Sequence, residues 1–363
     1  MIKLLIVDDS ALVRKLLGGI FTAEPDFEVR FARNGAEALE ELRRIPPDVI
    51  TLDIHMPDMD GLECLERIMI EQPCPVVMVS SVTPEGADTT LEALRRGAVD
   101  FFPKPSRALS LGIEELGPRL VEIVRGAARA RLRKSLNLRE RVRHRISQVL
   151  KDAPAPGNPP AAASALQAHG GLVLVGTSTG GPPALEALLI PLRIGFPWPI
   201  VVAQHMPGGF TGPLARRLDG LCALPVTELA APAVLRPGHV YIGRGDADIT
   251  ISRQDEDLLA ASVPAARDYP WHPSVDRLVR SAMAVVGPNR LVGVLMTGMG
   301  DDGAQAMTAL HAAGGRTIAE AEETAVVWGM PGELAKAGGA DFVLPLRQIA
   351  RHLEKLLAPF HAT

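Results

Sequence analysis

Short apolar runs alternate with helix-like stretches along the first hundred residues of the chain. The first of them, KLLIV at 3–7, has the pattern of a buried strand. The runs cover residues 3–7, 27–31, 49–54, 76–79 and 99–102. Between them, apolar residues recur at helical spacing in residues 12–20, 36–42, 62–70 and 91–96. Five strands separated by helices predict a doubly wound parallel α/β sheet.

The same alternation returns in the second half of the chain. Strands are expected at residues 172–175, 199–203, 291–296, 316–319 and 342–344. Helices are expected at residues 184–192, 275–286, 304–312 and 349–357. Residues 240–242 and 249–251 have the pattern of two short strands joined by a polar turn. We therefore predict a second doubly wound α/β domain with a parallel sheet.

The segment between the two α/β patterns has a different composition. Residues 119–151 contain eleven Lys or Arg against two Glu, and apolar residues recur at every fourth position from Leu138 to Leu150, which predicts a basic amphipathic helix. Residues 153–167 are rich in Pro and Ala and predict a semi-extended linker. The chain is thus divided into domains of residues 1–125 and 169–363, joined by the basic helix and linker of residues 126–168.

The composition limits the classes of function. With 47% hydrophobic residues and a net charge of −4, the chain is typical of a globular protein and not of a general nucleic-acid binder. The basic helix leaves contact with acidic lipid or nucleic acid open, but no aromatic residue lies between its arginines to stack on bases, and a solvated face is favoured. No apolar run approaches the roughly 18 residues of a membrane span. Three scattered cysteines suit a reducing compartment, so we expect a cytoplasmic protein without membrane insertion.

Polar residues follow the predicted strands of the first domain at the points where those strands end. Asp8, Asp9, Asp53, Ser80 and Lys104 hold these positions. The carboxyl ends of parallel strands share one edge of the sheet, so these side chains are expected to converge. Three carboxylates repel one another, which favours a divalent cation with oxygen ligands, and Mg²⁺ fits best. The metal and Lys104 would neutralise a phosphoryl group on Asp53, whereas the simpler alternative is that the acidic residues cap a helix and a loop.

Four motifs give this domain a resemblance to the receiver domains of bacterial two-component response regulators. They are IVDDS at 6–10, LDIHMPDMDG at 52–61, VMVSS at 77–81 and DFFPKP at 100–105. The resemblance implies a flavodoxin-like fold with Asp53 as the phosphate acceptor. It also implies that Mg²⁺ is bound by Asp8, Asp9, Asp53 and the backbone carbonyl of His55. Ser80 and Phe101 fall on the switch positions, and Lys104 is expected to contact the phosphoryl group.

The sequence LVLVGTSTGG at 172–181 opens the second domain. A buried strand is followed by a glycine-rich turn and by Pro182 and Pro183, which are typical of the start of a helix. A G-x-S-x-G turn of this kind presents a serine hydroxyl at the carboxyl end of a sheet, so Ser178 is a candidate nucleophile. The alternatives are a phosphate bound at the N-terminus of the helix, or a glycine-rich connection with a capping serine.

Two further polar residues lie near predicted strand ends in this domain. His205 directly follows one buried strand, and Asp302 lies in the loop after another. With Ser178 they supply the parts of an acyl-transfer triad, in which His205 is the base and Asp302 orients it. Backbone N–H groups near the glycine turns, including that of Met299, are candidates for an oxyanion hole. His272 is a rival base, and on the simpler alternative Asp302 caps the helix that follows it.

Five motifs give the second half a resemblance to the catalytic domain of the chemotaxis protein-glutamate methylesterases. They are VGTSTGG at 175–181, QHMPGGF at 204–210, HPSVD at 272–276, TGMGDDG at 297–303 and VVWGMP at 326–331. The resemblance implies an esterase that demethylates glutamate γ-esters on methyl-accepting chemotaxis receptors, often with glutamine deamidase activity. Ser178, His205 and Asp302 fall on the triad positions. Asp301 stands where asparagine is common, which leaves two carboxylates to orient the histidine, and the spacing favours Asp302.

We therefore expect a phosphorylation-switched serine esterase with Mg²⁺ in the first domain and no cofactor in the second. A chemotaxis histidine kinase would be the phosphodonor, and the unphosphorylated first domain would cover the esterase cleft. Two other functions stay open at this point: a response regulator whose second half binds a phosphate-bearing partner without catalysis, and a transcriptional regulator. No Lys follows the glycines as a P-loop needs, and no helix-turn-helix pattern is visible in the second half.

Overall fold

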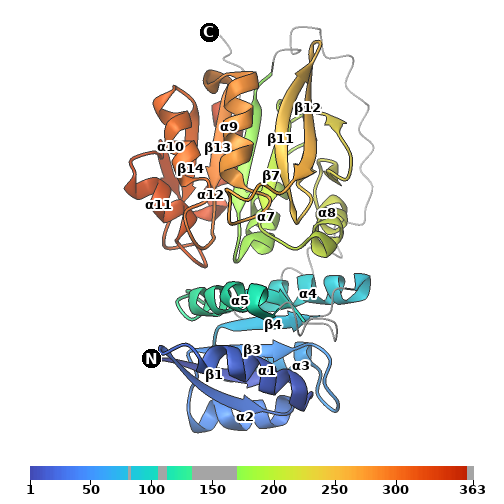
Figure 1. Ribbon diagram of the computed structural model, residues 1–363. Coiled ribbons are helices and arrows are strands. Elements are labelled where there is room, and N and C mark those ends of the chain that lie inside the picture. Colours follow the sequence, from blue (N-terminus) through green and yellow to red (C-terminus); the bar gives the residue numbers. More distant parts are fainter. Residues whose placement is uncertain (81–82, 105–112, 133–169, 358–363) are drawn as a thin grey trace.

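The computed structural model describes residues 1–80, 83–104, 113–132 and 170–357. These residues form two α/β bodies, an N-terminal one in blue to cyan-green and a C-terminal one in green to red (Figure 1). Most of the predicted basic helix and the whole Pro/Ala linker lie outside the described residues, in 133–169. Within the described part of the chain, no helix is long and apolar enough to cross a membrane.

The N-terminal domain is built on one five-stranded sheet with the order β2-β1-β3-β4-β5 and parallel pairing throughout. Its strands are β1 (Ile2–Val7), β2 (Phe27–Ala32), β3 (Val49–Asp53), β4 (Val76–Ser80) and β5 (Asp100–Pro103). Its helices are α1 (Ala11–Thr22), α2 (Gly35–Arg44), α3 (Gly61–Glu71), α4 (Pro84–Arg96) and α5 (Ile113–Ala127). The predicted doubly wound sheet is confirmed, with β3 and β4 buried along their whole length.

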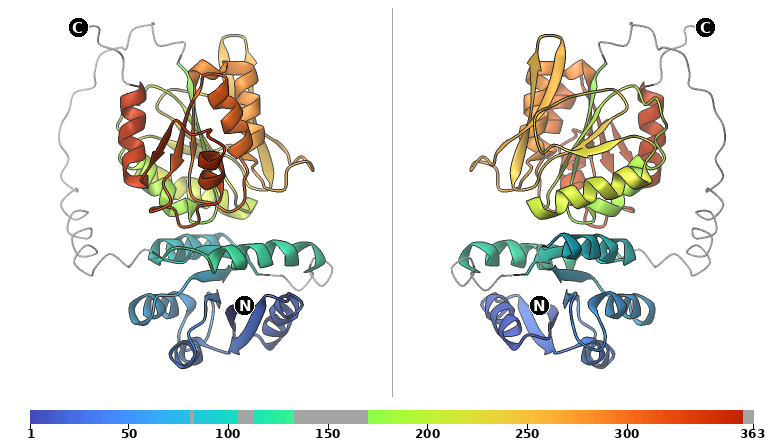
Figure 2. Two further views of the ribbon diagram at one scale, coloured as in Figure 1. Left: turned by 90° about the vertical axis from the view of Figure 1, so that its left-hand side faces the viewer. Right: turned by 90° about the vertical axis from the view of Figure 1, so that its right-hand side faces the viewer.

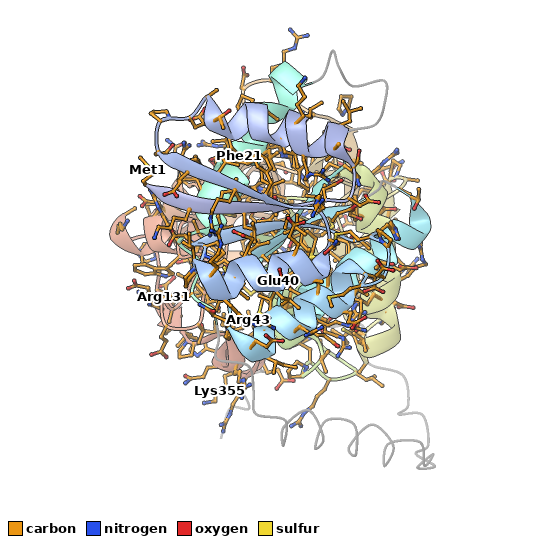
Figure 3. All side chains as sticks on the ribbon, turned by 90° about the horizontal axis from the view of Figure 1, so that it is seen from below. Met1, Phe21, Glu40, Arg43, Arg131 and Lys355 are labelled. Atoms are coloured by element: carbon orange, nitrogen blue, oxygen red, sulfur yellow. The ribbon has the colours of Figure 1, made fainter. Side chains whose placement is uncertain are left out.

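Local signals in the sequence fix where these helices begin and end. The side chains of Ser10, Asn34 and Asp60 each accept a hydrogen bond from a backbone N–H in the first turn of α1, α2 and α3. Gly97 ends α4 at a φ of 115°, a conformation that favours glycine. Figure 3 views the domain from below, where Arg43 lies on the outward face of α2 and forms a 2.6 Å ion pair with Glu71.

The C-terminal domain has a seven-stranded parallel sheet with the order β15-β14-β13-β6-β7-β10-β8. Its strands are β6 (Leu172–Thr177), β7 (Ile200–Gln204), β8 (Val226–Glu228), β10 (Val240–Ile242), β13 (Leu291–Leu295), β14 (Arg316–Glu320) and β15 (Phe342–Leu344). The strand order reverses at β6, which has β7 on one side and β13 on the other. Ligands of open α/β sheets bind at such a reversal, beside the carboxyl ends of the strands.

Helices cover both faces of this sheet. They are α7 (Gly181–Leu189), α8 (Gly208–Leu221), α9 (Val275–Val286), α10 (Ala304–Ala312), α11 (Met330–Lys336) and α12 (Leu346–Leu357). Buried residues of α7, α8 and α12 share one hydrophobic core, and those of α9, α10 and α11 share another. The second predicted α/β domain is thereby confirmed.

Two features of this domain differ from the sequence-based expectation. Residues 240–242 and 249–251 do form strands, but β10 belongs to the large sheet, while 249–251 lie in β11 (Ala247–Gln254). That strand pairs with β12 (Asp257–Pro264), in a separate small sheet that β9 (Ala233–Val234) completes. No helix is predicted at residues 208–221, but α8 begins at Gly208, because burial of Phe210 outweighs the poor helix propensity of its neighbouring glycines.

The two domains are in contact along one face. Helices α4 and α5 lie between the N-terminal sheet and the C-terminal domain (Figures 1 and 2). The rings of Phe101 and Phe210, one from each domain, have centroids 4.4 Å apart. Arg131 also reaches across, with its guanidinium 2.7 Å from the carboxylate of Glu322. Helix α5 of the N-terminal domain ends at Ala127.

Candidate functional site

The strand ends of the N-terminal domain gather the predicted acidic residues into one pocket. A ligand oxygen from each of Asp8, Asp9 and Asp53 lies within 4.8 Å of the other two. Asp8 and Asp53 are buried and Asp9 is exposed. The Lys104 ammonium lies 2.7 Å from a carboxylate oxygen of Asp53 and 3.1 Å from one of Asp8.

The electrostatics of this pocket favour a cation. Burial raises the pKa of Asp8, and the charge of Asp53 raises it further, against the lowering effect of Lys104. Burial alone would lower the pKa of Lys104, but Asp53 and Asp8 outweigh it and the pKa is raised. Three carboxylates against one ammonium leave an excess of negative charge on oxygen ligands, and the residues present therefore fit Mg²⁺. The imidazole of His55 is not among the side-chain ligand groups that gather in this cluster.

The two predicted switch residues lie between this pocket and the other domain. Ser80 is buried at the end of β4, where its hydroxyl accepts a 2.6 Å hydrogen bond from Thr90 and donates to the carbonyl of Gly86, both in α4. Phe101 is buried in β5 and contacts Phe210 of α8. Both are therefore attached to elements that touch the C-terminal domain.

Ser178 lies at the turn between β6 and α7, at the point where the strand order reverses. Its backbone N–H donates to Thr297 O at 2.9 Å, and its carbonyl accepts from Gly181 N at 2.7 Å, which makes the turn tight. Gly180 has a φ of 76°, so the turn requires a residue without a Cβ there. The Gln204 side chain donates to the backbone carbonyls of both Ser178 and His205, at 3.0 Å each, and ties the two strand ends together.

His205 and Asp302 are brought together as the sequence predicts. Nε2 of His205 lies 2.8 Å from Oδ2 of Asp302, and both side chains are buried, while Asp301 is exposed. Nδ1 of His205 is the ring nitrogen left for Ser178, because among the described residues it has no hydrogen-bond partner. Burial alone would raise the pKa of Asp302, but the hydrogen bond and charge of His205 outweigh it and the pKa is lowered.

The alternative roles considered for Asp302 and His272 do not match the structure. The residue at the N-cap of α10 is Gly303, and the Asp302 carboxylate accepts instead from Val275 N, at the start of α9. The His272 ring pairs with Asp248, which is fully buried in β11, at 2.8 Å. His272 therefore pairs with a different carboxylate from the one that His205 contacts.

Trp271 is a residue of the site that the sequence did not reveal. Its ring stacks on that of His205, with centroids 5.8 Å apart and planes inclined by 12°. The Arg119 guanidinium of α5 lies over the Trp271 ring, 5.9 Å from its centroid. The only available signal was an aromatic residue beside the HPSVD motif, which gave no indication of the contact with His205.

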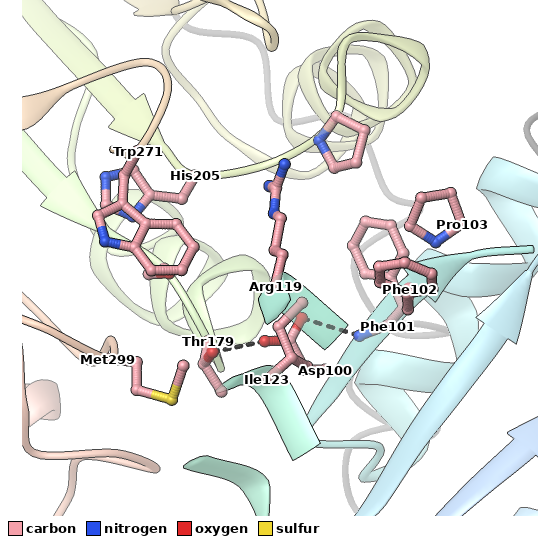
Figure 4. A pocket seen from close by; sticks show the side chains of 12 residues that line it. Asp100, Phe101, Phe102, Pro103, Arg119, Ile123, Thr179, His205, Trp271 and Met299 are labelled. Atoms are coloured by element: carbon pink, nitrogen blue, oxygen red, sulfur yellow. Dashed lines mark hydrogen bonds between the residues drawn. The ribbon is translucent and has the colours of Figure 1, made fainter. Parts of the chain in front are cut away.

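One pocket contains residues of both domains (Figure 4). From the C-terminal domain it is lined by Ser178, Thr179, His205, Pro207, Trp271 and Met299. From the N-terminal domain it is lined by Asp100, Phe101, Phe102, Pro103, Arg119 and Ile123. The Thr179 hydroxyl donates to the Asp100 carboxylate, and burial raises the pKa of that carboxyl against the lowering effect of the hydrogen bond. Beside the pocket, Gly126 of α5 packs so closely on Met299 that a Cβ there would collide with Met299 Sδ.

The fold and these two groups of residues define a class of protein: a response regulator whose receiver domain is joined to an α/β esterase domain. The family model described as CheB methylesterase matches residues 173–353, and the response regulator receiver domain model matches residues 4–112. The chain belongs to the family of protein-glutamate methylesterases/protein-glutamine glutaminases, and it is an enzyme of two-component chemotaxis signalling.

Relatives with known names match the chain along nearly its whole length. A protein-glutamate methylesterase/protein-glutamine glutaminase of Rhodopseudomonas palustris is 56% identical over 96% of this chain and 96% of its own. A second one, from Rhodospirillum rubrum, is 52% identical over 97% of this chain and 95% of its own. The crystal structure of the Thermotoga maritima CheB methylesterase catalytic domain is 38% identical, with a TM-score of 0.50 over 52% of this chain and 98% of that one.

Proposed function

We propose that this chain is a phosphorylation-activated serine esterase of chemotactic adaptation. Its substrates would be glutamate γ-methyl esters on methyl-accepting chemotaxis receptors, and it would also deamidate receptor glutamines. The pairing of His205 with Asp302 beside Ser178 supports the hydrolytic part of the proposal. Its three cysteines, all unpaired, are in keeping with action in the cytoplasm.

The residues have distinct roles in the proposed reaction. The Ser178 hydroxyl attacks the γ-carbonyl carbon while its proton passes to Nδ1 of His205, and Asp302 stabilises the imidazolium through Nε2. The backbone N–H of Met299 stabilises the oxyanion. Methanol leaves with the proton from His205, or ammonia leaves when the substrate is glutamine. Water then hydrolyses the acyl-enzyme by the reverse proton path and releases glutamate.

The observation that carries the regulatory proposal is the shared pocket. Residues of β5 and α5 line the same pocket as Ser178 and His205, which supports a receiver domain that covers the proposed catalytic residues. Two contacts join the receiver domain to residues beside Ser178 and His205. They are the hydrogen bond from Thr179 to Asp100 and the stacking of Arg119 on Trp271. A helix of a chemoreceptor would have to displace these side chains to reach Ser178.

Phosphorylation of Asp53 by a chemotaxis histidine kinase would weaken this cover. Asp8, Asp9, Asp53 and the backbone carbonyl of His55 would hold Mg²⁺, which neutralises charge on the incoming phosphoryl group when bound. Phosphoryl oxygens on Asp53 would compete with α4 for the Ser80 hydroxyl. The Lys104 ammonium, which now pairs with the Asp53 carboxylate, would pair with the phosphoryl group instead. Because α4 packs on α7 and α8, a shift of α4 and of Phe101 disturbs the interface.

The test is the initial rate of methanol release from methylated receptor, with and without a small-molecule phosphodonor and Mg²⁺. A closing bias of about 1.4 kcal/mol corresponds to a tenfold change, so the phosphodonor should raise the rate about tenfold. The Asp53→Asn variant should keep the low rate in both conditions. An equal response of the wild type and Asp53→Asn would reject Asp53 as the switch.

A further inference from the structure

The Asp302 carboxylate is bound by the beginning of a helix that is not its own. Oδ2, which lies 2.8 Å from Nε2 of His205, also accepts a hydrogen bond from Val275 N at 2.7 Å. Oδ1 accepts a hydrogen bond from Asp276 N at 3.1 Å. The Ser274 hydroxyl lies 3.1 Å from the same Oδ1. Both oxygens therefore have partners at the N-terminus of α9, and these partners fix the plane of the carboxylate and the direction in which Oδ2 faces His205.

Ser274 has little freedom in how it uses its hydroxyl. It is fully buried at the N-cap of α9, and its oxygen accepts from Arg277 N at 3.3 Å. Its proton is thus available for Asp302. The backbone N–H of Ser274 donates to Asp248 at 2.9 Å, and Arg277 pairs with the same buried carboxylate at 2.7 Å. Asp248 in this way anchors the residue that contacts Asp302.

The two helices around Asp302 also cap each other. Asp276, in the first turn of α9, accepts from Ala306 N at 2.8 Å, in the first turn of α10. Asp302, which precedes α10, accepts from the first turn of α9. Each helix N-terminus is the positive end of its dipole, so each stabilises a carboxylate supplied by the other. This reciprocal pair holds the Asp302 loop against α9, and the Ser274 hydroxyl adds a side-chain donor to the two backbone donors on the Asp302 carboxylate.

We propose that Ser274 is a positioning residue of the hydrolytic reaction, which acts by orienting Asp302 toward His205. The inference rests on the triad proposed above. Without the hydroxyl, Oδ1 keeps only Asp276 N and Oδ2 keeps Val275 N, so two α9 donors in place of three hold the carboxylate in its orientation toward Nε2 of His205. The base is then less well oriented, while the pocket that receives the substrate is unchanged. The loss should therefore appear in kcat and not in KM.

The experiment compares Ser274→Ala with Ser281→Ala in the full chain, with and without phosphodonor. Ser281 is the matched control because it lies on the same helix and is also hydrogen bonded, with Ile251 N and Leu278 O, but it does not touch the triad. We expect Ser274→Ala to lower kcat about tenfold, or 1.4 kcal/mol in activation free energy, at constant KM. Ser281→Ala should keep kcat. Ser274→Gly removes the same hydroxyl at little cost to the N-cap and should repeat the loss if the alanine variant folds poorly.

A double-mutant cycle with Asp302→Ala separates positioning from general damage. If Ser274 acts through Asp302, its replacement should cause no further loss in the Asp302→Ala background. Equal losses in both backgrounds, or a Ser274→Ala kcat equal to that of Ser281→Ala, would overturn the inference. Full activity of Asp302→Ala alone would instead overturn the proposed triad, so the two failures are distinguishable.

Discussion

Gly126→Ala should raise the activity of the unphosphorylated enzyme by weakening the contact between its two domains. Gly126 is buried on α5, and a Cβ at this position would collide with the side chain of Met299 in the C-terminal domain. Overfilling a packed contact costs about 1–3 kcal/mol. If that cost falls on the closed arrangement, it offsets most or all of the closing bias of about 1.4 kcal/mol, so the open fraction rises severalfold, up to a limit of about tenfold for the fully open enzyme.

The control for this prediction is Gly117→Ala, the same change on the same helix. A Cβ on Gly117 would meet only Ile20, in the N-terminal domain, at an ordinary contact distance of 3.8 Å. Both changes add one methyl group to α5, and of the two only the methyl group at 126 meets the C-terminal domain, so a gain in basal rate confined to Gly126→Ala reports the contact with Met299. The assay is methanol release from methylated receptor without phosphodonor, accompanied by the extent of phosphorylation of Asp53 as a check on the receiver fold. If both variants keep the wild-type basal rate, Gly126 is not part of a closing contact.

Three further predictions concern the catalytic base, the metal and pH. His205→Ala should abolish esterase activity, whereas His272→Ala should retain most of it, because His272 pairs with Asp248 and His205 pairs with Asp302. If a rate assay gives the reverse ranking, His272 is the base. A chelator should block phosphorylation of Asp53 by a small-molecule donor, measured by mass spectrometry; phosphorylation unaffected by chelator would speak against the metal site. Burial raises the pKa of Asp100 in the closed form, so the closed form is favoured at low pH and is lost as the pH rises from 3.8 through the raised value. The ratio of the esterase rate without phosphodonor to the rate with phosphodonor should therefore increase as the pH rises through this range. The increase should be smaller in the Asp100→Asn variant.

The sequence predicted the parts of the sites that follow from the ends of parallel strands. Asp53, Ser178 and His205 are predicted as site residues because a polar residue at the end of a buried strand lies at the common edge of the sheet. Asp302 is predicted from its place in a loop and from the resemblance. Its hydrogen bonds to the start of α9 are not predicted, because they join residues 26 to 28 positions apart in the chain. Nothing local in the sequence encodes which helix start a carboxylate will meet.

The elements that the sequence missed have weak local signals. Strand β12 contains small residues and gives no clear alternation, and it is fixed by antiparallel pairing with β11. Helix α8 opens with two glycines and contains Pro213, and it forms because Phe210, Leu214 and Leu218 are buried. The cover over the catalytic pocket was expected from the order of the two domains, but Arg119, Trp271 and Gly126 became visible only in three dimensions. In each case tertiary packing outweighed the local preference.

The most direct test of the account is the rate at which a serine-directed covalent inhibitor labels the full chain. Labelling should occur at Ser178, be absent in Ser178→Ala, and be strongly slowed in His205→Ala, because His205 activates the hydroxyl. Phosphodonor with Mg²⁺ should accelerate labelling of the wild type and leave the rate for Asp53→Asn unchanged, because the receiver domain covers Ser178 in the closed form. Labelling at another residue, or an equal rate at Ser178 with and without phosphorylation of Asp53, would contradict the account.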